Sequence, residues 1–447
     1  MSECSEPQFE MKLNEMPEGF LARVVALQLV DEVLQRKQPL DHALELSEGL
    51  KLLDVRDRAF VRMLVATTIR RLGQIDDLIS KAVEKEAPSN LSLMNILRVG
   101  VAQIIFMEAA DHAAVDLSVR LAEEKGLSGK KGFVNGVLRT IARVGREWRS
   151  RQDEGRLNTP EWLLKSWIAD YGLRAAADIA KAHLSEAPLD ISIKSDAERA
   201  YWASQFKASE LATGTLRRIS GGAVKELEGF DEGQWWVQDA SAAIPAQLFG
   251  DIAGKDVYDL CAAPGGKTLQ LAAKGAFVYA LDRSAKRLKR LEQNIERMNL
   301  IQNVRVQVED AATWAVANPA DYILLDAPCS ATGTARRHPD VLHLKAPIDV
   351  ERLCALQMNI LKNAFANLSV GGILIYCTCS LQRAEGEEQI AKFLEKEPDA
   401  KRLPIDKSEL GGWDEAITDE GDVRVFPYHQ AALGGMDGFY IARLTKA

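Results

Sequence analysis

The sequence predicts a multidomain protein with an all-α N-terminal domain, a small α+β module and a C-terminal α/β domain built on a doubly wound parallel sheet. Its 447 residues are enough for about three domains at roughly 150 residues each. Apolar residues keep helical spacing through the first third, and from residue 237 short apolar strands alternate with helices. We place a mobile tail at 1–19 and the three domains at 20–150, 151–236 and 237–447.

Composition excludes several classes of protein. Hydrophobic residues make up 47% and charged residues 27% of the chain, an ordinary globular mixture. We find no apolar run long enough for a membrane span and no signal peptide at the acidic N-terminus. The six cysteines are too few for a disulfide framework and lack metal-ligand spacing. We therefore expect a cytoplasmic protein with reduced thiols, no membrane association and no metal.

The sequence predicts that the first domain is a bundle of six or seven helices, and the last part of this domain is basic. Val24, Leu27 and Leu34 keep helical spacing, and Gly73 and Gly126 separate helices. Between residues 125 and 149 there are seven Lys or Arg and one Glu. Such a run is either a solvated helix face or a surface that contacts phosphates. The residues that we would assign to a phosphate-contacting surface are Lys130, Lys131, Arg139 and Arg143.

Polar residues 150–160 are a linker candidate, and a small α+β module follows. Helices at 160–171 and 173–184 precede a strand at 189–193, a helix near 196–205 and further short strands. The C-terminal domain then has strands at 257–260, 277–281, 304–308, 322–325 and 372–376, with long helices at 284–299 and 349–368. Ligands bind such sheets at the carboxyl ends of the strands.

The turn after the first of these strands carries the first candidate site. Its residues are Cys261, Ala262, Ala263, Pro264, Gly265, Gly266 and Lys267. Small residues let a ligand approach the backbone, and the following helix offers free N–H groups. Gly266-Lys267-Thr268 matches the end of a phosphate-binding P-loop, but Cys261 stands where that motif needs glycine.

Two carboxylates end the next two strands. Asp282 follows the second strand, where an acidic residue accepts hydrogen bonds from ribose hydroxyls in nucleotide-binding folds. Asp310 follows the third, within reach of an adenine amino group. Asp282 alone could be a helix cap, but a nucleoside-shaped ligand explains both residues together.

Two cysteines follow later strands of the same sheet. Cys329 lies in Asp326-Ala327-Pro328-Cys329-Ser330, and Cys379 lies in Thr378-Cys379-Ser380. Neighbouring strand ends can place both thiols over one pocket, where a thiolate is a strong nucleophile. The alternative is two buried, inert cysteines. The adjacent Asp326 favours a functional site, because a carboxylate beside a core strand is costly unless it is used.

These motifs resemble those of the RNA cytosine-C5 methyltransferases of the Sun/Fmu family. The resemblance rests on DLCAAPGGKT at 259–268, LDAPCSATGTARRHPD at 325–340 and YCTCS at 376–380. The closest likeness is to the bacterial subgroup that modifies small-subunit ribosomal RNA (the RsmB type), in which a NusB-like RNA-binding domain precedes the catalytic domain. The likeness extends over residues 20–447.

The resemblance implies a class I methyltransferase domain, S-adenosylmethionine as cofactor and 16S ribosomal RNA, unassembled or partly assembled, as partner of a monomeric enzyme. Residues Cys261–Lys267 would line the cofactor site, Asp282 would hold its ribose and Asp310 its adenine. Asp326 would lie near cofactor and base. Cys379 would be the nucleophile, and Cys329 would assist product release. Arg336 and Arg337 would contact RNA.

The same chemistry follows from the substrate itself. Carbon 5 of cytosine is a poor nucleophile until a thiolate adds to the adjacent carbon, and hydrogen bonding at the ring nitrogen by Asp326 favours that addition. Cys377 stands where the family often has serine, so it is a second candidate for attack. A transfer RNA enzyme, a DNA cytosine methyltransferase and a non-catalytic RNA-binding factor are the rival functions. The NusB-like part speaks against the first, and Cys379 speaks against the second.

Overall fold

The computed structural model describes residues 17–83, 86–219 and 224–447, so most of the tail expected at 1–19 lies outside them. The chain forms two compact units. One contains the N-terminal part through Lys165 together with His338–Leu344, and the other contains Ser166–Arg337 and Lys345–Ala447. No helix of the described residues is both long and apolar enough to cross a bilayer.

The first unit is helical, as expected. Its elements are α2 (Phe20–Leu34), α3 (Leu40–Leu46), α4 (Glu48–Lys51), α5 (Val55–Arg70), α6 (Leu72–Ala82), α7 (Leu91–Val101), the π-helical turn η1 (Ala102–Phe106), α8 (Asp111–Glu124), η2 (Ser128–Lys130), α9 (Lys131–Arg149) and α10 (Glu154–Asn158). Polar side chains cap four of these helices, α4, α5, α7 and α10; for example, Asp54 accepts from the Asp57 N–H and Asn90 from the Leu93 N–H. One apolar core joins α2 to α9.

The segment that we expected to be a linker is part of this unit. Residues 154–158 form α10, and the Asn158 side chain bonds to the backbone N–H and the side chain of Gln74 on α6 at 3.1 and 2.9 Å. A Cβ at Gly73 would lie 1.7 Å from the Leu157 carbonyl oxygen, so only glycine permits this approach. The helical unit therefore continues to Lys165, beyond the boundary that we placed at 150.

Residues His338–Leu344, although late in the sequence, also belong to the helical unit. The Asp340 carboxylate accepts from the Leu40 N–H at the start of α3, at 2.9 Å. His343, in α16 (Val341–Leu344), lies 3.3 Å from the Ile69 carbonyl oxygen, and burial lowers the pKa of His343 to about 4. Sequence spacing gave no indication of these contacts.

The second unit begins at Ser166, within α11 (Glu161–Ala182), whose helical path breaks at Gly172, and continues with the small α+β module. The module contains β1 (Leu189–Ile193), η3 (Asp196–Glu198), α12 (Arg199–Phe206), β2 (Ser209–Glu210), β3 (Leu216–Arg218), η4 (Val224–Glu226) and β4 (Trp235–Val237). The strands form a sheet in the order β2-β3-β1-β4. Inside it, Arg217 makes two hydrogen bonds of 2.7 Å to the buried Asp190 carboxylate.

The large sheet has the order β10-β12-β9-β8-β5-β6-β7, with β11 paired to β12. Its strands are β5 (Asp256–Leu260), β6 (Phe277–Asp282), β7 (Val304–Val308), β8 (Ala320–Asp326), β9 (Leu368–Thr378), β10 (Ala400–Arg402), β11 (Val423–Val425) and β12 (Phe439–Lys446). The five strands from β7 to β9 are parallel. β12 is antiparallel to β9, β10 and β11, so the sheet is mixed rather than wholly parallel.

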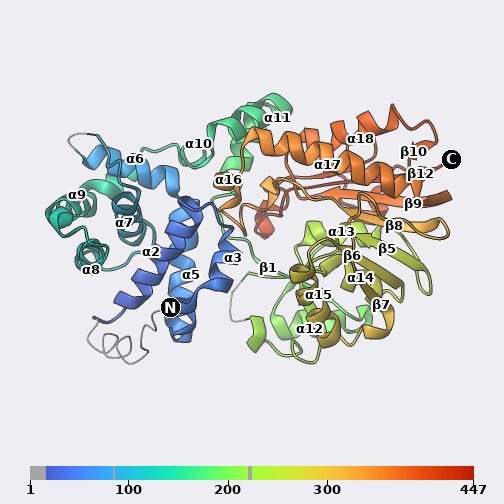
Figure 1. Ribbon diagram of the computed structural model, residues 1–447, viewed down its shortest axis with the longest axis horizontal. Helices are drawn as coiled ribbons and strands as arrows, with labels where there is room; N and C mark the ends of the chain where they lie inside the picture. Colours follow the sequence, from blue (N-terminus) through green and yellow to red (C-terminus); the bar gives the residue numbers. More distant parts are fainter. Residues whose placement is uncertain (1–16, 84–85, 220–223) are drawn as a thin grey trace, which may run out of the picture. The chain divides into compact units, whose positions relative to one another are not determined.

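Helices cover both faces of this sheet (Figure 1). They are α13 (Ala240–Gln247), α14 (Gly266–Ala273), α15 (Ala285–Arg297), α17 (Pro347–Ala366) and α18 (Glu387–Leu394), with short 3-10 turns at Ile301–Asn303, Thr332–Thr334, Arg383–Glu385, Lys407–Leu410 and Ala431–Leu433. Alternation along β8 explains the two layers: Leu324 packs with α13 to α15, whereas Leu325 packs with α17 and α18. Strand order reverses between β5 and β8, which places the ligand crevice at their carboxyl ends.

Candidate active site

The turn from β5 to α14 adopts a backbone that suits close approach by a ligand. Cys261 and Gly265 have φ angles of +64° and +110°. A Cβ at Gly265 would lie 2.2 Å from the Leu291 side chain, so glycine is required there. The Asp259 carboxylate is fully buried at the end of β5 and accepts from the Thr268 hydroxyl at 2.6 Å. Burial raises the pKa of Asp259 to about 7.

Asp282 ties the end of β6 to this turn. Its carboxylate accepts from the N–H groups of Ala263 at 3.3 Å and Ser284 at 2.8 Å, and it pairs with Arg287 at 3.2 Å. Asp310 is exposed past the end of β7, and its carboxylate accepts from the Ala312 N–H at 2.9 Å. Three successive strand ends therefore present the glycine-rich turn and two carboxylates along one edge of the sheet.

Lys267 connects the turn to Asp326 at the end of β8. Its ammonium group lies 2.7 Å from one carboxylate oxygen of Asp326, whose side chain keeps 32% of its surface exposed. Burial alone would lower the pKa of Lys267, but the Asp326 carboxylate outweighs this effect and raises it. The Cys377 thiol lies 3.5 Å from the other oxygen of Asp326. Cys377 is fully buried, which raises the pKa of its thiol well above the usual range.

The two candidate thiols come together. The sulfur atoms of Cys329 and Cys379 are 3.5 Å apart, and both residues are partly exposed. They follow β8 and β9, which are neighbours in the parallel sheet. The hydrogen bond with Cys379 and burial raise the pKa of the Cys329 thiol well above its usual value. Cys329 therefore keeps its proton and can donate it toward the Cys379 sulfur.

Two residues expected to contact RNA, Arg336 and Arg337, bond to groups of the protein itself. Arg337 bonds to the carboxylates of Asp239 at 2.9 Å and Asp437 at 3.0 Å. Arg336 is almost fully buried and donates to the Gly434 carbonyl oxygen at 2.6 Å. A guanidinium held by two carboxylates has few donors left for a phosphate. The expectation is therefore wrong for Arg336, whereas RNA contact by Arg337, whose side chain keeps 21% of its surface exposed, stays a prediction.

The four remaining basic candidates lie in the helical unit, on or beside α9. Lys130, Arg139 and Arg143 are exposed, whereas Lys131 is half-buried and pairs with Glu123 at 2.9 Å. Arg139 and Arg143 are four residues apart, so they share one face of α9. Both line a groove of about 570 Å³ between α8 and α9. We call Lys130, Lys131, Arg139 and Arg143 the α9 basic surface.

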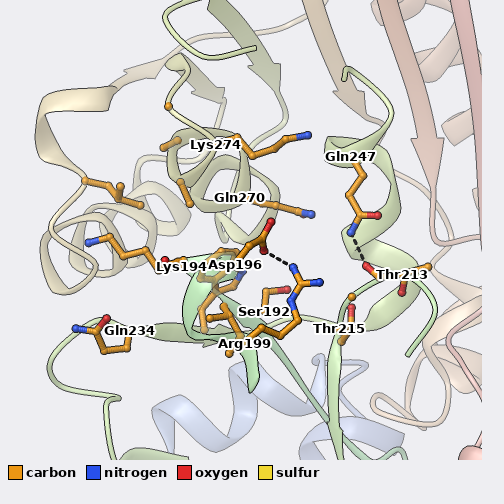
Figure 2. Close-up of a pocket in the computed structure, with 18 of the residues that line it drawn as sticks. Ser192, Lys194, Asp196, Arg199, Thr213, Thr215, Gln234, Gln247, Gln270 and Lys274 are labelled. Atoms are coloured by element: carbon orange, nitrogen blue, oxygen red, sulfur yellow. Dashed lines mark hydrogen bonds and ion pairs between the residues drawn. The ribbon is translucent and has the colours of Figure 1, made fainter. Parts of the chain in front are cut away.

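A larger cavity of about 1040 Å³ (Figure 2) has no cysteine in its lining. It is lined by residues of the small module and by the last turn of α14, the opposite end of that helix from the glycine-rich turn. Its cations already have partners: Lys194 donates to the Met298 carbonyl, Arg199 pairs with Asp196, and Lys274 donates to the Ala246 carbonyl. This cavity is therefore separate from the candidate active site.

A doubly wound sheet with a glycine-rich turn and carboxylates at its switch point is the architecture of enzymes that bind a nucleoside-containing cofactor. Residues 250–445 match the model of the family described as 16S rRNA methyltransferase RsmB/F, and residues 21–143 match the NusB family. The chain belongs to the RsmB/F family of rRNA methyltransferases, which use S-adenosylmethionine.

Curated relatives support this assignment along nearly the whole chain. Ribosomal RNA small subunit methyltransferase B of Erwinia tasmaniensis is 33% identical over 95% of this chain and 98% of its own length. A probable enzyme of the same name from Synechocystis is 31% identical over 95% of this chain and 99% of its own. Among solved structures, the crystal structure of PH0851 has a similar fold, with a TM-score of 0.77 and 23% identity over 96% of this chain and 99% of that one.

Proposed function

We propose that this enzyme methylates carbon 5 of a specific cytosine in 16S ribosomal RNA through a covalent bond between Cys379 and the base. The observation that carries this proposal is the pair of thiols 3.5 Å apart, at the ends of adjacent strands and beside Asp326. A methyltransferase acting on an oxygen or an exocyclic nitrogen needs no thiol. Carbon 5 needs one, because the ring must be made electron-rich before it can accept a methyl group.

The donor set along the strand ends fits S-adenosylmethionine, which supplies the methyl group. Residues Cys261–Lys267 would line the site of its methionine part, and the N–H groups of Gly266 and Lys267 lie at the start of α14. Asp282 would accept hydrogen bonds from ribose hydroxyls, and Asp310 would face the adenine. Asp282 is anchored by two backbone N–H groups, so its carboxylate is held in a fixed position.

Each residue of the thiol site then has a distinct task. The Cys379 thiolate adds to carbon 6 of the cytosine, and the Asp326 side chain, held by Lys267, passes a proton from solvent to the ring nitrogen, which neutralises the charge that the addition creates. After carbon 5 has taken the methyl group, a base such as a water molecule removes the proton from carbon 5. The electrons of that C–H bond re-form the ring double bond, and Cys379 leaves carbon 6 as a thiolate. Cys329, which keeps its proton, donates a hydrogen bond to the departing sulfur. The base must be unstacked to enter, as a base in single-stranded or remodelled RNA can be.

The product of the reaction tests this proposal. Incubating the purified chain with 16S RNA and a labelled methyl donor, followed by digestion to nucleosides, should give 5-methylcytidine as the labelled product. Bisulfite sequencing should show one protected cytosine in the same RNA. Using both free 16S RNA and intact small subunits will show which assembly state is the substrate. A labelled N4- or O-methylated nucleoside would contradict the proposal, since neither requires the thiol pair.

We also propose that the α9 basic surface contacts RNA phosphates. Changing Lys130, Arg139 and Arg143 together to Gln should weaken RNA binding and reduce the slope of log affinity against log salt by about 0.7–0.9 for each phosphate that the variant no longer neutralises. Fluorescence anisotropy with labelled 16S fragments at several salt concentrations measures both quantities. The matched control changes three exposed cations of α15, Lys286, Lys289 and Arg290, to Gln. Equal losses of affinity in the two variants would show that only net charge matters.

A further inference from the structure

A buried carboxylate lies between the two thiol-bearing loops. Glu385 is fully buried in the 3-10 turn before α18, and four donors converge on it. The Ser330 N–H and the Gln357 amide reach Oε1 at 2.9 and 3.0 Å, and the hydroxyls of Ser330 and Ser380 reach Oε2 at 2.5 and 2.6 Å. A carboxylate offers about four acceptor sites, so these donors use its whole capacity.

The two serines bound by this carboxylate each follow a thiol of the active site directly. Ser330 comes after Cys329, and Ser380 comes after Cys379. We propose that Glu385 is a positioning residue that sets the separation of the Cys329 and Cys379 thiols by joining Ser330 to Ser380. The effect of Glu385 on catalysis rests on the covalent mechanism proposed above, whereas its effect on the distance between the two thiols does not.

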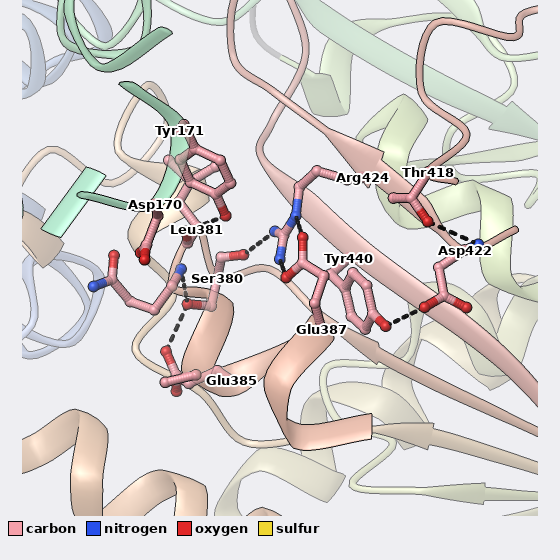
Figure 3. Close-up of polar contacts among 12 residues, drawn as sticks. Asp170, Tyr171, Ser380, Leu381, Glu385, Glu387, Thr418, Asp422, Arg424 and Tyr440 are labelled. Carbon is pink, nitrogen blue, oxygen red and sulfur yellow. Dashed lines mark hydrogen bonds and ion pairs between the residues drawn. The ribbon is translucent and has the colours of Figure 1, made fainter. Parts of the chain in front are cut away.

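A second group of contacts holds the Cys379 loop from another side, as Figure 3 shows. Arg424 donates to the Ser380 carbonyl oxygen at 2.7 Å and makes two hydrogen bonds to Glu387, at 2.9 and 2.6 Å. These contacts fix the backbone of one loop only. The contacts of Glu385 join this loop to the Cys329 loop. They act together with two direct contacts between the loops: the Ser330 and Ser380 hydroxyls lie 3.0 Å apart, and the Gly333 N–H donates to the Cys379 carbonyl oxygen at 2.9 Å.

The chemistry of the four donors separates positioning from proton transfer. The Oε1 partners are N–H groups, which can only donate, whereas the Oε2 partners are hydroxyls, which can rotate and accept. A glutamine at 385 can therefore keep its oxygen toward the N–H groups and donate its amide to the hydroxyls. Glu385→Gln should preserve the hydrogen bonds by which residue 385 joins Ser330 to Ser380, and Glu385→Ala should remove them. A residue that transferred protons would lose its function in both variants.

The rate of disulfide formation between the two thiols measures their geometry directly. Diamide is added to the full-length protein without RNA or methyl donor, and the Cys329–Cys379 peptide is quantified by mass spectrometry. Because a disulfide requires narrow limits of Cβ separation and torsion, we expect a rate at least about tenfold lower in Glu385→Ala and within about threefold of the wild type in Glu385→Gln. Asp422→Asn is the matched control, since it neutralises another buried carboxylate, bound by Arg402 and Tyr440 (Figure 3).

Methyl transfer gives the second measurement. Glu385→Ala should lower kcat about a hundredfold and leave KM for S-adenosylmethionine within about twofold, because a displacement of about 1 Å at a reacting group costs that much. Glu385→Gln should restore most of kcat. An unchanged disulfide rate in Glu385→Ala would overturn the proposal, and so would equal loss of kcat in both variants. If Glu385→Ala does not fold, Ser380→Ala, which removes one hydroxyl, must slow disulfide formation and Ser380→Thr must restore it.

The two proposals fail in different ways. The disulfide assay contains no substrate, so its outcome is independent of whether a cysteine ever bonds to cytosine. Failure of the covalent mechanism would instead appear as methylation that persists without Cys379, while the disulfide rates still followed the residue at 385.

Discussion

Replacing Cys379 with alanine should abolish methylation of the RNA. The thiolate is the only group proposed to make carbon 5 reactive, and removing a covalent nucleophile costs on the order of 10⁴-fold or more in rate. Binding of S-adenosylmethionine should be unchanged, because the turn at 261–267 and Asp282 do not contact this residue through any described hydrogen bond. Single-turnover transfer from a labelled donor and calorimetric titration of the donor measure the two effects separately.

Cys377 provides the matched control for this experiment. It lies two residues away on the same strand end, but it is fully buried and its thiol faces Asp326. Burial raises the pKa of its thiol well above the usual range, which makes it a poor nucleophile. Cys377→Ser should keep at least about a tenth of the wild-type rate, since serine preserves a donor toward Asp326. Full activity in Cys379→Ala together with loss in Cys377→Ser would reassign the attacking sulfur to residue 377.

The parts of the site that the sequence predicted share one property, which is that each residue follows a short apolar strand. The carboxyl ends of the strands lie along one edge of a parallel sheet. The order of strands in the sequence was therefore enough to predict that Cys261, Asp282, Asp326 and Cys379 lie close together. Glu385 was missed for the opposite reason. It lies in a short turn among several acidic residues, and its burial depends on hydroxyls that are 55 and 5 positions away in the chain. No local pattern distinguishes it from Glu387 or Glu388.

The helical unit and residues 336–340 show the same contrast between what a local pattern predicts and what depends on distant residues. Helical spacing predicted the bundle, because each helix buries one apolar face. The string Arg336-Arg337-His338-Pro339-Asp340 looks like an exposed basic motif, yet its arginines meet Asp239, Asp437 and the Gly434 carbonyl, while Asp340 caps α3. Those partners lie about 100 to 300 residues away in the chain. The antiparallel strand β12 was likewise not predicted, because its partners on β9 lie 62 to 72 residues away in the chain.

Replacing Cys329 with alanine should trap the enzyme on its substrate. In the wild type the Cys329 thiol lies 3.5 Å from the Cys379 sulfur and keeps its proton, so it can stabilise the thiolate that leaves carbon 6. Without this donor, addition and methyl transfer proceed but release slows, and a covalent protein–RNA adduct accumulates. A band of reduced mobility on a denaturing gel that disappears after ribonuclease treatment identifies it.

The double variant Cys329→Ala/Cys379→Ala shows whether the adduct forms as proposed. It should give no adduct, because the bond to RNA requires the Cys379 sulfur. Ser330 and Ser380 are intact in both variants, so both serines still bond to Glu385. The comparison therefore isolates the chemistry of the two sulfurs. If Cys329→Ala turned over at the wild-type rate without an adduct, release would need no second thiol. The 3.5 Å contact would then be a packing feature, with Cys379 acting alone.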